Sequence, residues 1–311
     1  MKFKKPNFWD KKNAKILPYL FLPLSLFLWL INLTKKLVIK KEKFKKIKTI
    51  CVGNIYLGGT GKTSLSLKIH EILNKKNVKT CFIKKDYTDQ RDEQKLLENS
   101  GKLFKSKRRK QSLIDAINDG YKVAIFDDGL QDYSIDYDLI FVCFNDENWI
   151  GNGFTIPSGP LREHFKNIRK YKNIFITGNM ENLEKVREKI FKINPKANIF
   201  ISNYIPLNLS DFNDRDNYLV FSGIGNHKSF ISMLKKNNVN ILKDVEFPDH
   251  YNYSDYDVKS IISEAKKTNC KIITTEKDFL RLSEKFHDEI NFIKSDIEIQ
   301  NENSFINILL N

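Results

Sequence analysis

A glycine-rich loop with a lysine and three hydroxyl residues is the first group of side chains here that could do chemistry. It comprises Gly58, Gly59, Thr60, Gly61, Lys62, Thr63 and Ser64, and it joins a strand-like run at 49–55 to a helix-like run at 64–74. In such a loop backbone N–H groups surround a phosphate and the helix N-terminus adds partial positive charge. Lys62 can reach the terminal phosphates, and the Thr63 hydroxyl can bind magnesium. The loop therefore predicts a site for a nucleoside triphosphate with Mg²⁺.

A flexible turn is the alternative interpretation of these glycines, but the Gly-Lys-Thr ending favours a phosphate site. The usual spacing of such loops would place glycine at position 56, where this chain has Tyr56. The adjacent Gly58 and Gly59 are expected to supply the missing backbone freedom.

Carboxylates at the end of a second apolar strand suit the metal. Asp127 and Asp128 follow the run 123–126, and carboxylates at this place hold magnesium or its water shell in nucleotide enzymes. A simple acidic turn before Gly129 is the alternative. Further along, Arg162 could neutralise a transferring phosphoryl group and Glu163 could join the metal shell.

Composition and charge limit the class of partner. The chain has 311 residues, 41% of them hydrophobic, and a net charge of +15. Residues 1–48 hold fourteen Lys against one Asp and one Glu, so +12 of that charge lies at the N-terminus. This distribution argues against a nucleic-acid partner. The four Cys residues are widely spaced and predict buried thiols in a reducing compartment.

An uncharged apolar run at 16–33 is flanked by lysines. As one helix it would be about 27 Å long, enough to cross or sink into a bilayer, and it predicts a membrane anchor. A cleavable signal peptide is disfavoured because no small-residue cleavage site follows. Lysines on both sides leave a full span and a helix embedded from the cytoplasmic side equally open.

Alternating apolar runs and helical patterns after residue 48 predict an α/β fold with a mainly parallel, P-loop NTPase-like sheet. The expected strands are 49–55, 78–83, 123–126, 139–144 and 174–177, and a second series begins near residue 205 with strands at 218–221, 239–242 and 271–274. We expect a basic membrane-anchoring segment at 1–47, a kinase core at 48–206, and a smaller α/β domain at 207–311 that closes over the nucleotide. The boundary is placed at 206–216, which is rich in Asn and Asp.

Seven motifs in a fixed order give the chain a family resemblance over nearly its whole length. They are Gly53-Asn54, the phosphate loop, Asp127-Asp128-Gly129-Leu130-Gln131, Pro157-Ser158-Gly159-Pro160-Leu161-Arg162-Glu163, Phe221-Ser222-Gly223-Ile224-Gly225-Asn226, Phe247-Pro248-Asp249-His250 and Thr274-Thr275-Glu276-Lys277-Asp278. With the N-terminal run, they resemble tetraacyldisaccharide 4'-kinase, the lipid A 4'-kinase of Gram-negative bacteria.

The resemblance implies transfer of the ATP γ-phosphate to the 4'-hydroxyl of a membrane-embedded tetraacylated glucosamine disaccharide 1-phosphate. It implies that Asp92 and His250 take the hydroxyl proton, while Lys62, Arg162 and Mg²⁺ stabilise the developing charge. His250 would come from the second domain, so domain closure would assemble the site. The implied location is the cytoplasmic face of the inner membrane, among membrane lipids and with no obligate protein partner.

The segment 84–94 departs from the family pattern. Where the family has Arg-Gly-Tyr-Gly after the second strand, this chain has Lys84-Lys85-Asp86-Tyr87-Thr88, and the glycine before Asp92 is replaced by Arg91. These departures keep open a noncatalytic nucleotide-binding module. The phosphate loop itself leaves a second alternative, a membrane-associated ATPase switch, although such switches would place a lysine where this chain has Leu57.

Overall fold

The chain folds into two compact units. The computed structural model describes residues 6–10, 16–86, 90–147, 149–178, 183–213 and 215–311. The lysines at positions 2–15 and residues 87–89 of the divergent 84–94 segment therefore lie outside the described residues. The first unit comprises Met1–Asp86, Ser100–Ser202 and Ile299–Asn311, and the second comprises Tyr87–Asn99 and Asn203–Glu298.

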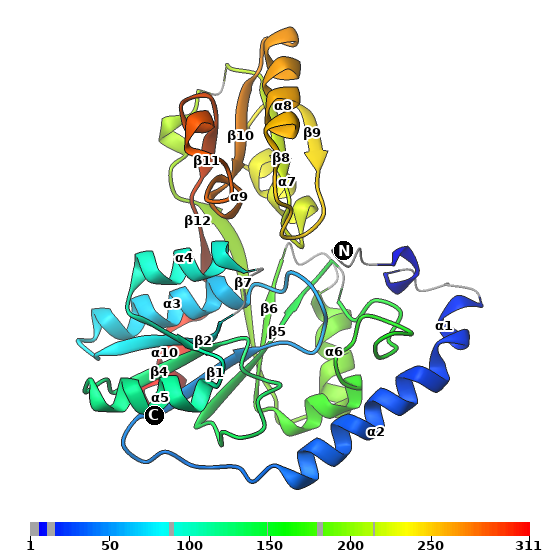
Figure 1. The fold of residues 1–311 in the computed structure, drawn as a ribbon, viewed down its shortest axis with the longest axis vertical. Helices are drawn as coiled ribbons and strands as arrows, with labels where there is room; N and C mark the ends of the chain where they lie inside the picture. The colour runs from blue at the N-terminus through cyan, green and yellow to red at the C-terminus, as the bar shows by residue number, and fades with distance from the viewer. Residues whose placement is uncertain (1–5, 11–15, 87–89, 148, 179–182, 214) are drawn as a thin grey trace. The chain divides into compact units, whose positions relative to one another are not determined.

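The first unit is built on an eight-stranded sheet (Figure 1). Its strands are β1 (Lys48–Gly53), β2 (Thr80–Lys85), β3 (Leu103–Ser106), β4 (Val123–Asp127), β5 (Leu139–Asn145), β6 (Asn173–Thr177), β7 (Asn198–Pro206) and β12 (Ser295–Ile299). They lie in the order β12-β7-β6-β5-β1-β4-β2-β3, and every neighbouring pair from β7 to β3 is parallel. The predicted mainly parallel α/β sheet is confirmed.

Helices cover both faces of this sheet. They are α3 (Lys62–Lys75), α5 (Arg109–Asn118), α6 (Leu183–Ile193) and α10 (Glu302–Leu310). Phe305 of α10 packs on Phe141 and Phe175, whereas the neighbouring strand residues Val142 and Ile174 pack in a cluster with α6. Because successive side chains of a strand point to opposite faces, α10 and α6 cover opposite sides.

The second unit has its own four-stranded parallel sheet, in the order β11-β10-β8-β9. Its elements are α4 (Arg91–Ser100), β8 (Tyr218–Ser222), α7 (His227–Lys236), β9 (Ile241–Glu246), α8 (Asp255–Lys267), β10 (Lys271–Thr275), α9 (Glu276–Phe279) and β11 (Asn291–Ile293). Short 3-10 helices lie at Leu209–Asp211 and Glu284–Glu289 in this unit, and at Asn7–Trp9 and Phe165–Lys170 in the first unit.

The predicted division into 48–206 and 207–311 needs two corrections. Residues 87–99 belong to the second unit, and residues 299–311 belong to the first. The second correction follows from packing, because Phe305 of α10 is fully buried against Phe141, Phe175 and Phe200 of the large sheet. Apolar periodicity along the chain does not reveal such a return to an earlier sheet.

The apolar N-terminal run is not the single helix expected over 16–33. It forms α1 (Leu17–Leu20) and α2 (Leu22–Val38), which are separated at Phe21. Pro23 sits in the first turn of α2, and a proline there has no N–H to continue the preceding helix. Within the described part of the chain, no helix is long and apolar enough to cross a membrane.

Helix α2 contacts the rest of the first unit through the polar side chain of Ser25, while several of its large apolar side chains stay exposed. Ser25 is buried; its hydroxyl donates to the Thr155 carbonyl at 3.0 Å and lies 2.8 Å from the Ser158 hydroxyl. Leu26 and Phe27, by contrast, are each 58% exposed. Ser25 therefore fixes α2 to the protein, while large apolar side chains in the first part of the helix stay exposed.

Candidate phosphoryl-transfer site

The phosphate loop connects β1 to α3 with the backbone that its glycines allow. Gly58 has φ 140° and Gly61, the residue before α3, has φ 79°, both in the region that favours glycine. The Asn54 side-chain amide donates to the Thr60 hydroxyl at 2.9 Å, and the Asn145 amide donates to the Gly59 carbonyl at 2.7 Å. These amides hold the loop in one conformation while the N-terminus of α3 supplies anion-binding N–H groups.

Tyr56 takes the place of the missing glycine by packing beneath the loop. It is 1% exposed, and a Cβ on Gly58 would lie 3.1 Å from its ring. Its hydroxyl donates to Asp10 at 2.7 Å. An aromatic ring at position 56 therefore fits because position 58 has no side chain.

Asp127 lies at the end of β4, beneath the first turn of α3. It is fully buried, and one carboxylate oxygen lies 2.5 Å from Nζ of Lys84, which is also fully buried. The hydroxyls of Thr63 and Ser66 each lie 3.4 Å from its oxygens. The carboxylate and the Thr63 hydroxyl thus lie together, as the metal prediction requires, but Lys84 already neutralises the carboxylate.

Asp128 brings the predicted cations together. One of its oxygens accepts a hydrogen bond from Arg162 at 2.8 Å and lies 3.9 Å from Nζ of Lys62. Burial alone would raise the pKa of this carboxyl group, but Lys62 and Arg162 hold it well below its usual range. Its φ of 57° is a left-handed conformation for a residue with a side chain. Lys62, Arg162 and Asp128 therefore form one charged group beside the loop.

Glu163 has a different set of partners from the two aspartates. Its oxygens accept from Tyr171 at 2.9 Å and Asn167 at 2.8 Å, and Lys36 of α2 lies 3.3 Å away. These contacts tie the end of the 157–163 motif to α2. The predicted metal role of Glu163 stays a prediction.

The donor set beside the loop fits magnesium in type. Thr63, Asp127 and Asp128 supply the oxygen ligands that a hard cation prefers, and nucleotide sites hold their metal mainly through one hydroxyl, a carboxylate and the phosphates. Among the described residues no group of three or more His, Cys, Asp or Glu side chains could hold a metal by itself. The phosphates of the nucleotide would have to complete the coordination.

The second predicted pair, Asp92 and His250, lies within the second unit. Asp92 is in the first turn of α4 and 4% exposed, and His250 Nδ1 lies 3.4 Å from its Oδ1. This corrects the expectation that the two residues come from different domains, because residues 87–99 belong to the same unit as His250. Domain closure is therefore not needed to form the pair.

The electrostatics of this pair follow from its neighbours. Burial would raise the pKa of Asp92, but His250, Arg281 and Lys277 lower it far below its usual range. Burial likewise disfavours protonated His250, yet Asp92, Asp249 and Glu93 raise its pKa overall. Each partner stabilises the charged form of the other.

Some residues of these sites gave no signal in the sequence. Lys84 reads as an ordinary lysine at a strand end, and Arg281 lies beyond the last quoted motif. Asn145 follows an apolar strand, and polar residues at carboxyl ends of parallel strands are common site positions. That placement is the one signal that could have identified Asn145.

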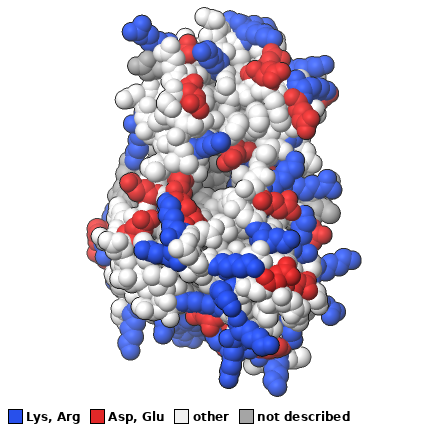
Figure 2. Space-filling view, turned by 90° about the vertical axis from the view of Figure 1, so that its left-hand side faces the viewer, with Lys and Arg blue, Asp and Glu red and all other residues white. Residues whose placement is uncertain are grey.

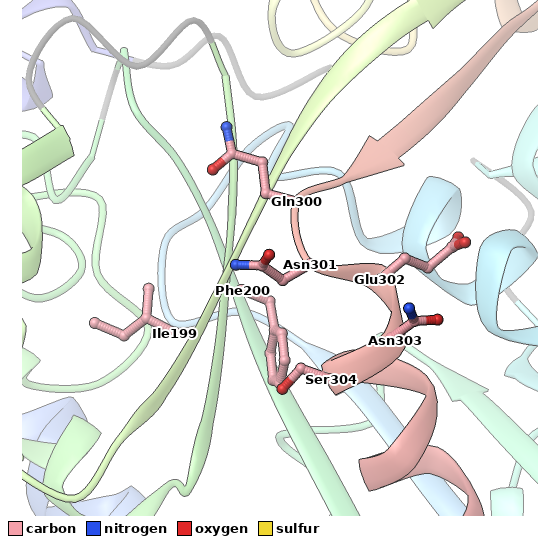
Figure 3. A pocket seen from close by; sticks show the side chains of 7 residues that line it. All are labelled: Ile199, Phe200, Gln300, Asn301, Glu302, Asn303 and Ser304. Atoms are coloured by element: carbon pink, nitrogen blue, oxygen red, sulfur yellow. The ribbon is translucent and has the colours of Figure 1, made fainter.

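A cavity of about 570 Å³ lies elsewhere in the first unit, between β7 and the start of α10 (Figure 3). Figure 3 shows Asn301 and Ser304 next to Phe200, with Gln300 pointing away from them. None of the predicted site residues lines this cavity. We do not place the nucleotide there. On the face in Figure 2, Lys and Arg side chains are interspersed with Asp and Glu and do not form one continuous basic surface.

Known proteins match this chain over nearly its whole length. The family model "LpxK: Tetraacyldisaccharide-1-P 4'-kinase" matches residues 17–311. A tetraacyldisaccharide 4'-kinase of Pelagibacter ubique (strain HTCC1062) is 55% identical, covering 100% of this chain and 98% of that protein. One of Rickettsia canadensis (strain McKiel) is 33% identical, covering 96% and 93%.

A solved structure shares the fold. It is the "apo" form of LpxK from Aquifex aeolicus in complex with ATP, with a TM-score of 0.69 and 22% identity. The match covers 94% of this chain and 98% of that one.

Proposed function

The chain belongs to the tetraacyldisaccharide 4'-kinase family, and we propose that it transfers the γ-phosphoryl group of ATP to the 4'-hydroxyl of a tetraacylated glucosamine disaccharide 1-phosphate in lipid A biosynthesis. The observation that carries this proposal is the group of Lys62, Arg162 and Asp128 beside the phosphate loop. Two cations held together at that place match the charge of a nucleotide's terminal phosphates.

Each residue has a proposed part in the transfer. The loop N–H groups and Lys62 bind the phosphates, and Arg162 stabilises charge that develops on the transferring group. Thr63, Asp127 and Asp128 would hold Mg²⁺, which supplies further positive charge to the phosphate oxygens. Asp92 and His250 take the proton of the attacking hydroxyl.

The acceptor is a lipid, and we propose that α1 and α2 hold the enzyme on the cytoplasmic face of the inner membrane. Support comes from the exposed apolar side chains of this region: Tyr19 is 59% exposed, Leu20 67% and Phe27 58%. Because Ser25 fixes another side of α2 to the protein, the exposed side chains would sink into one leaflet. The sugar hydroxyl would then lie near the membrane surface.

Transfer of radiolabel from γ-labelled ATP to a tetraacylated disaccharide 1-phosphate in detergent tests the reaction. Lys62→Ala should lower the rate by about 10²–10³-fold, the scale for loss of one electrostatic donor. Lys75→Ala at the other, exposed end of α3 is the matched control and should leave the rate unchanged. ATP hydrolysis with an unlabelled lipid would point to an ATPase switch, and ATP binding without turnover to a nucleotide-binding module.

A further inference from the structure

Two nitrogens of Arg281 donate hydrogen bonds to Asp92, the carboxylate of the Asp92–His250 pair. Its Nε and Nη2 donate to Asp92 Oδ2 at 3.2 and 2.9 Å. The other carboxylate oxygen, Oδ1, is the one that faces His250 Nδ1. The carboxylate therefore has one oxygen for arginine and one for histidine, and its rotation is blocked.

The same arginine also reaches the backbone that carries His250. Its Nη1 donates to the Gly223 carbonyl at 2.8 Å, and that carbonyl accepts the backbone N–H of His250 at 2.9 Å. His250 has φ 54°, a conformation that the surrounding structure must enforce for a residue with a side chain. Gly223 leaves no room for a side chain, because a Cβ there would lie 2.9 Å from the Tyr253 hydroxyl.

Asp278 fixes the arginine in turn. Its Oδ1 accepts from Arg281 Nη1 at 3.0 Å, from the Gly223 N–H at 2.9 Å and from the Tyr253 hydroxyl at 2.7 Å. Asp278 is fully buried, and the Arg281 side chain is 8% exposed. The buried guanidinium of Arg281 therefore lies between two carboxylates, Asp92 and Asp278, which compensate for its loss of solvation.

Other charged side chains among the described residues also face the pair, but they contact it differently from Arg281. Lys277 pairs with Glu93 at 3.0 Å and acts on Asp92 only through its charge, and Asp249 lies 3.9 Å from His250 Nε2. Arginine suits the central position because its planar fork offers several donors in fixed directions, whereas lysine offers one point charge.

We propose that Arg281 is the positioning residue of the Asp92–His250 pair, holding the Asp92 carboxylate and the His250 backbone in the relative orientation that accepts a proton from the sugar hydroxyl. This inference deepens the proposed function and rests on it for the identity of the acceptor. No bond to Arg281 forms or breaks in the reaction. The proton moves from the hydroxyl to the pair, and Arg281 keeps its own protons throughout.

Steady-state kinetics on the full chain in detergent test the role. Arg281→Met should lower kcat by about 10²-fold, the scale for a misplaced catalytic group, with KM for ATP unchanged. Arg281→Lys keeps the charge without the fork and should recover part of the loss. Lys285→Met, which removes an exposed lysine of the same unit, is the control. In an Asp92→Asn background, Arg281→Met should cause little further loss because the two residues act as one unit.

The proposal is overturned if the wild type is active and both Arg281→Met and Arg281→Lys have kcat values within about twofold of the wild-type kcat. Equal additional losses with and without Asp92→Asn would also overturn it, because they would show that Arg281 acts independently of Asp92.

A second readout separates this inference from the proposed function. Labelled histidine in the full chain gives the imidazole ¹⁵N signals, with His250→Gln for assignment. Arg281→Met should move the His250 signals, whereas Lys285→Met should not. Unchanged His250 signals in Arg281→Met would refute the positioning role, whether or not the wild type phosphorylates the lipid. A wild type that does not phosphorylate the lipid would by itself contradict only the proposed acceptor.

Discussion

The buried pair of Lys84 and Asp127 offers a direct test of how the phosphate site is held together. Both side chains are fully buried and their charged atoms lie 2.5 Å apart. Lys84→Met keeps most of the volume of the side chain and removes the cation. Asp127 then keeps the hydroxyls of Thr63 and Ser66, each at 3.4 Å, as weaker polar neighbours.

The expected loss of stability is large. Removing one partner of a buried ion pair typically costs about 3–5 kcal/mol because an uncompensated charge stays buried. Replacing both partners can be nearly neutral, so Lys84→Met with Asp127→Leu should recover most of the loss. Lys75→Met removes an exposed i,i+4 partner of Glu71 and should cost no more than about 0.5 kcal/mol.

Tryptophan fluorescence during urea unfolding measures the loss of stability in the unit that contains Lys84 and Asp127. The chain has three Trp residues, Trp9, Trp29 and Trp149, and all belong to the first unit. The signal therefore follows the unit that contains the ion pair. Lys84→Met within about 1 kcal/mol of the wild type, or a double variant no more stable than the single one, would refute the reasoning.

Four other expectations follow from the structure. His250→Ala should leave ATP binding intact and lower turnover by about 10²-fold, so unchanged turnover would remove it from the mechanism. Because the pKa of His250 is raised in the folded state, its contribution to stability is complete below about pH 6.5 and is lost as pH rises through the folded-state pKa. The difference in unfolding free energy between wild type and His250→Ala should therefore shrink over that range. A difference that stays constant with pH would contradict this expectation. Phe27→Glu with Leu30→Glu should weaken sedimentation with anionic vesicles, whereas undiminished binding would assign membrane contact to another surface. Gly53→Ala should destabilise the first unit by about 1–3 kcal/mol in urea unfolding, because its Cβ would lie 2.5 Å from that of Leu130; a neutral result would show that β1 can shift.

Local motifs with a fixed spacing could be predicted from the sequence. The phosphate loop and the Asp127–Asp128 strand end depend on neighbouring residues, and five predicted strands of the large sheet correspond to β1, β2, β4, β5 and β6. Each of those strands is buried on both faces, so it shows as a continuous apolar run. Strand β9 was expected at 239–242 but occupies Ile241–Glu246, where Lys243, Asp244 and Glu246 interrupt the apolar run.

Long-range pairing could not be predicted in the same way. Lys84 and Asp127 are 43 positions apart, and a buried lysine looks like any other lysine until its partner is placed. Arg281 and Asp92 are 189 positions apart. Helix α10 follows the second unit in sequence yet packs on the large sheet of the first unit, and this placement depends on tertiary packing alone.

Ser25 links the apolar helix α2 to the turn that precedes Arg162, one of the charged residues beside the phosphate loop. Its hydroxyl accepts the backbone N–H of Ser158 at 3.1 Å and donates to the Thr155 carbonyl, so α2 holds the turn that precedes Arg162. Lys36, further along α2, holds Glu163 on the other side of that arginine. A shift of α2 would therefore move the backbone on both sides of Arg162. If α2 binds the membrane as we propose, the position of Arg162, to which we assign the transferring phosphoryl group, depends on the helix that faces the lipid.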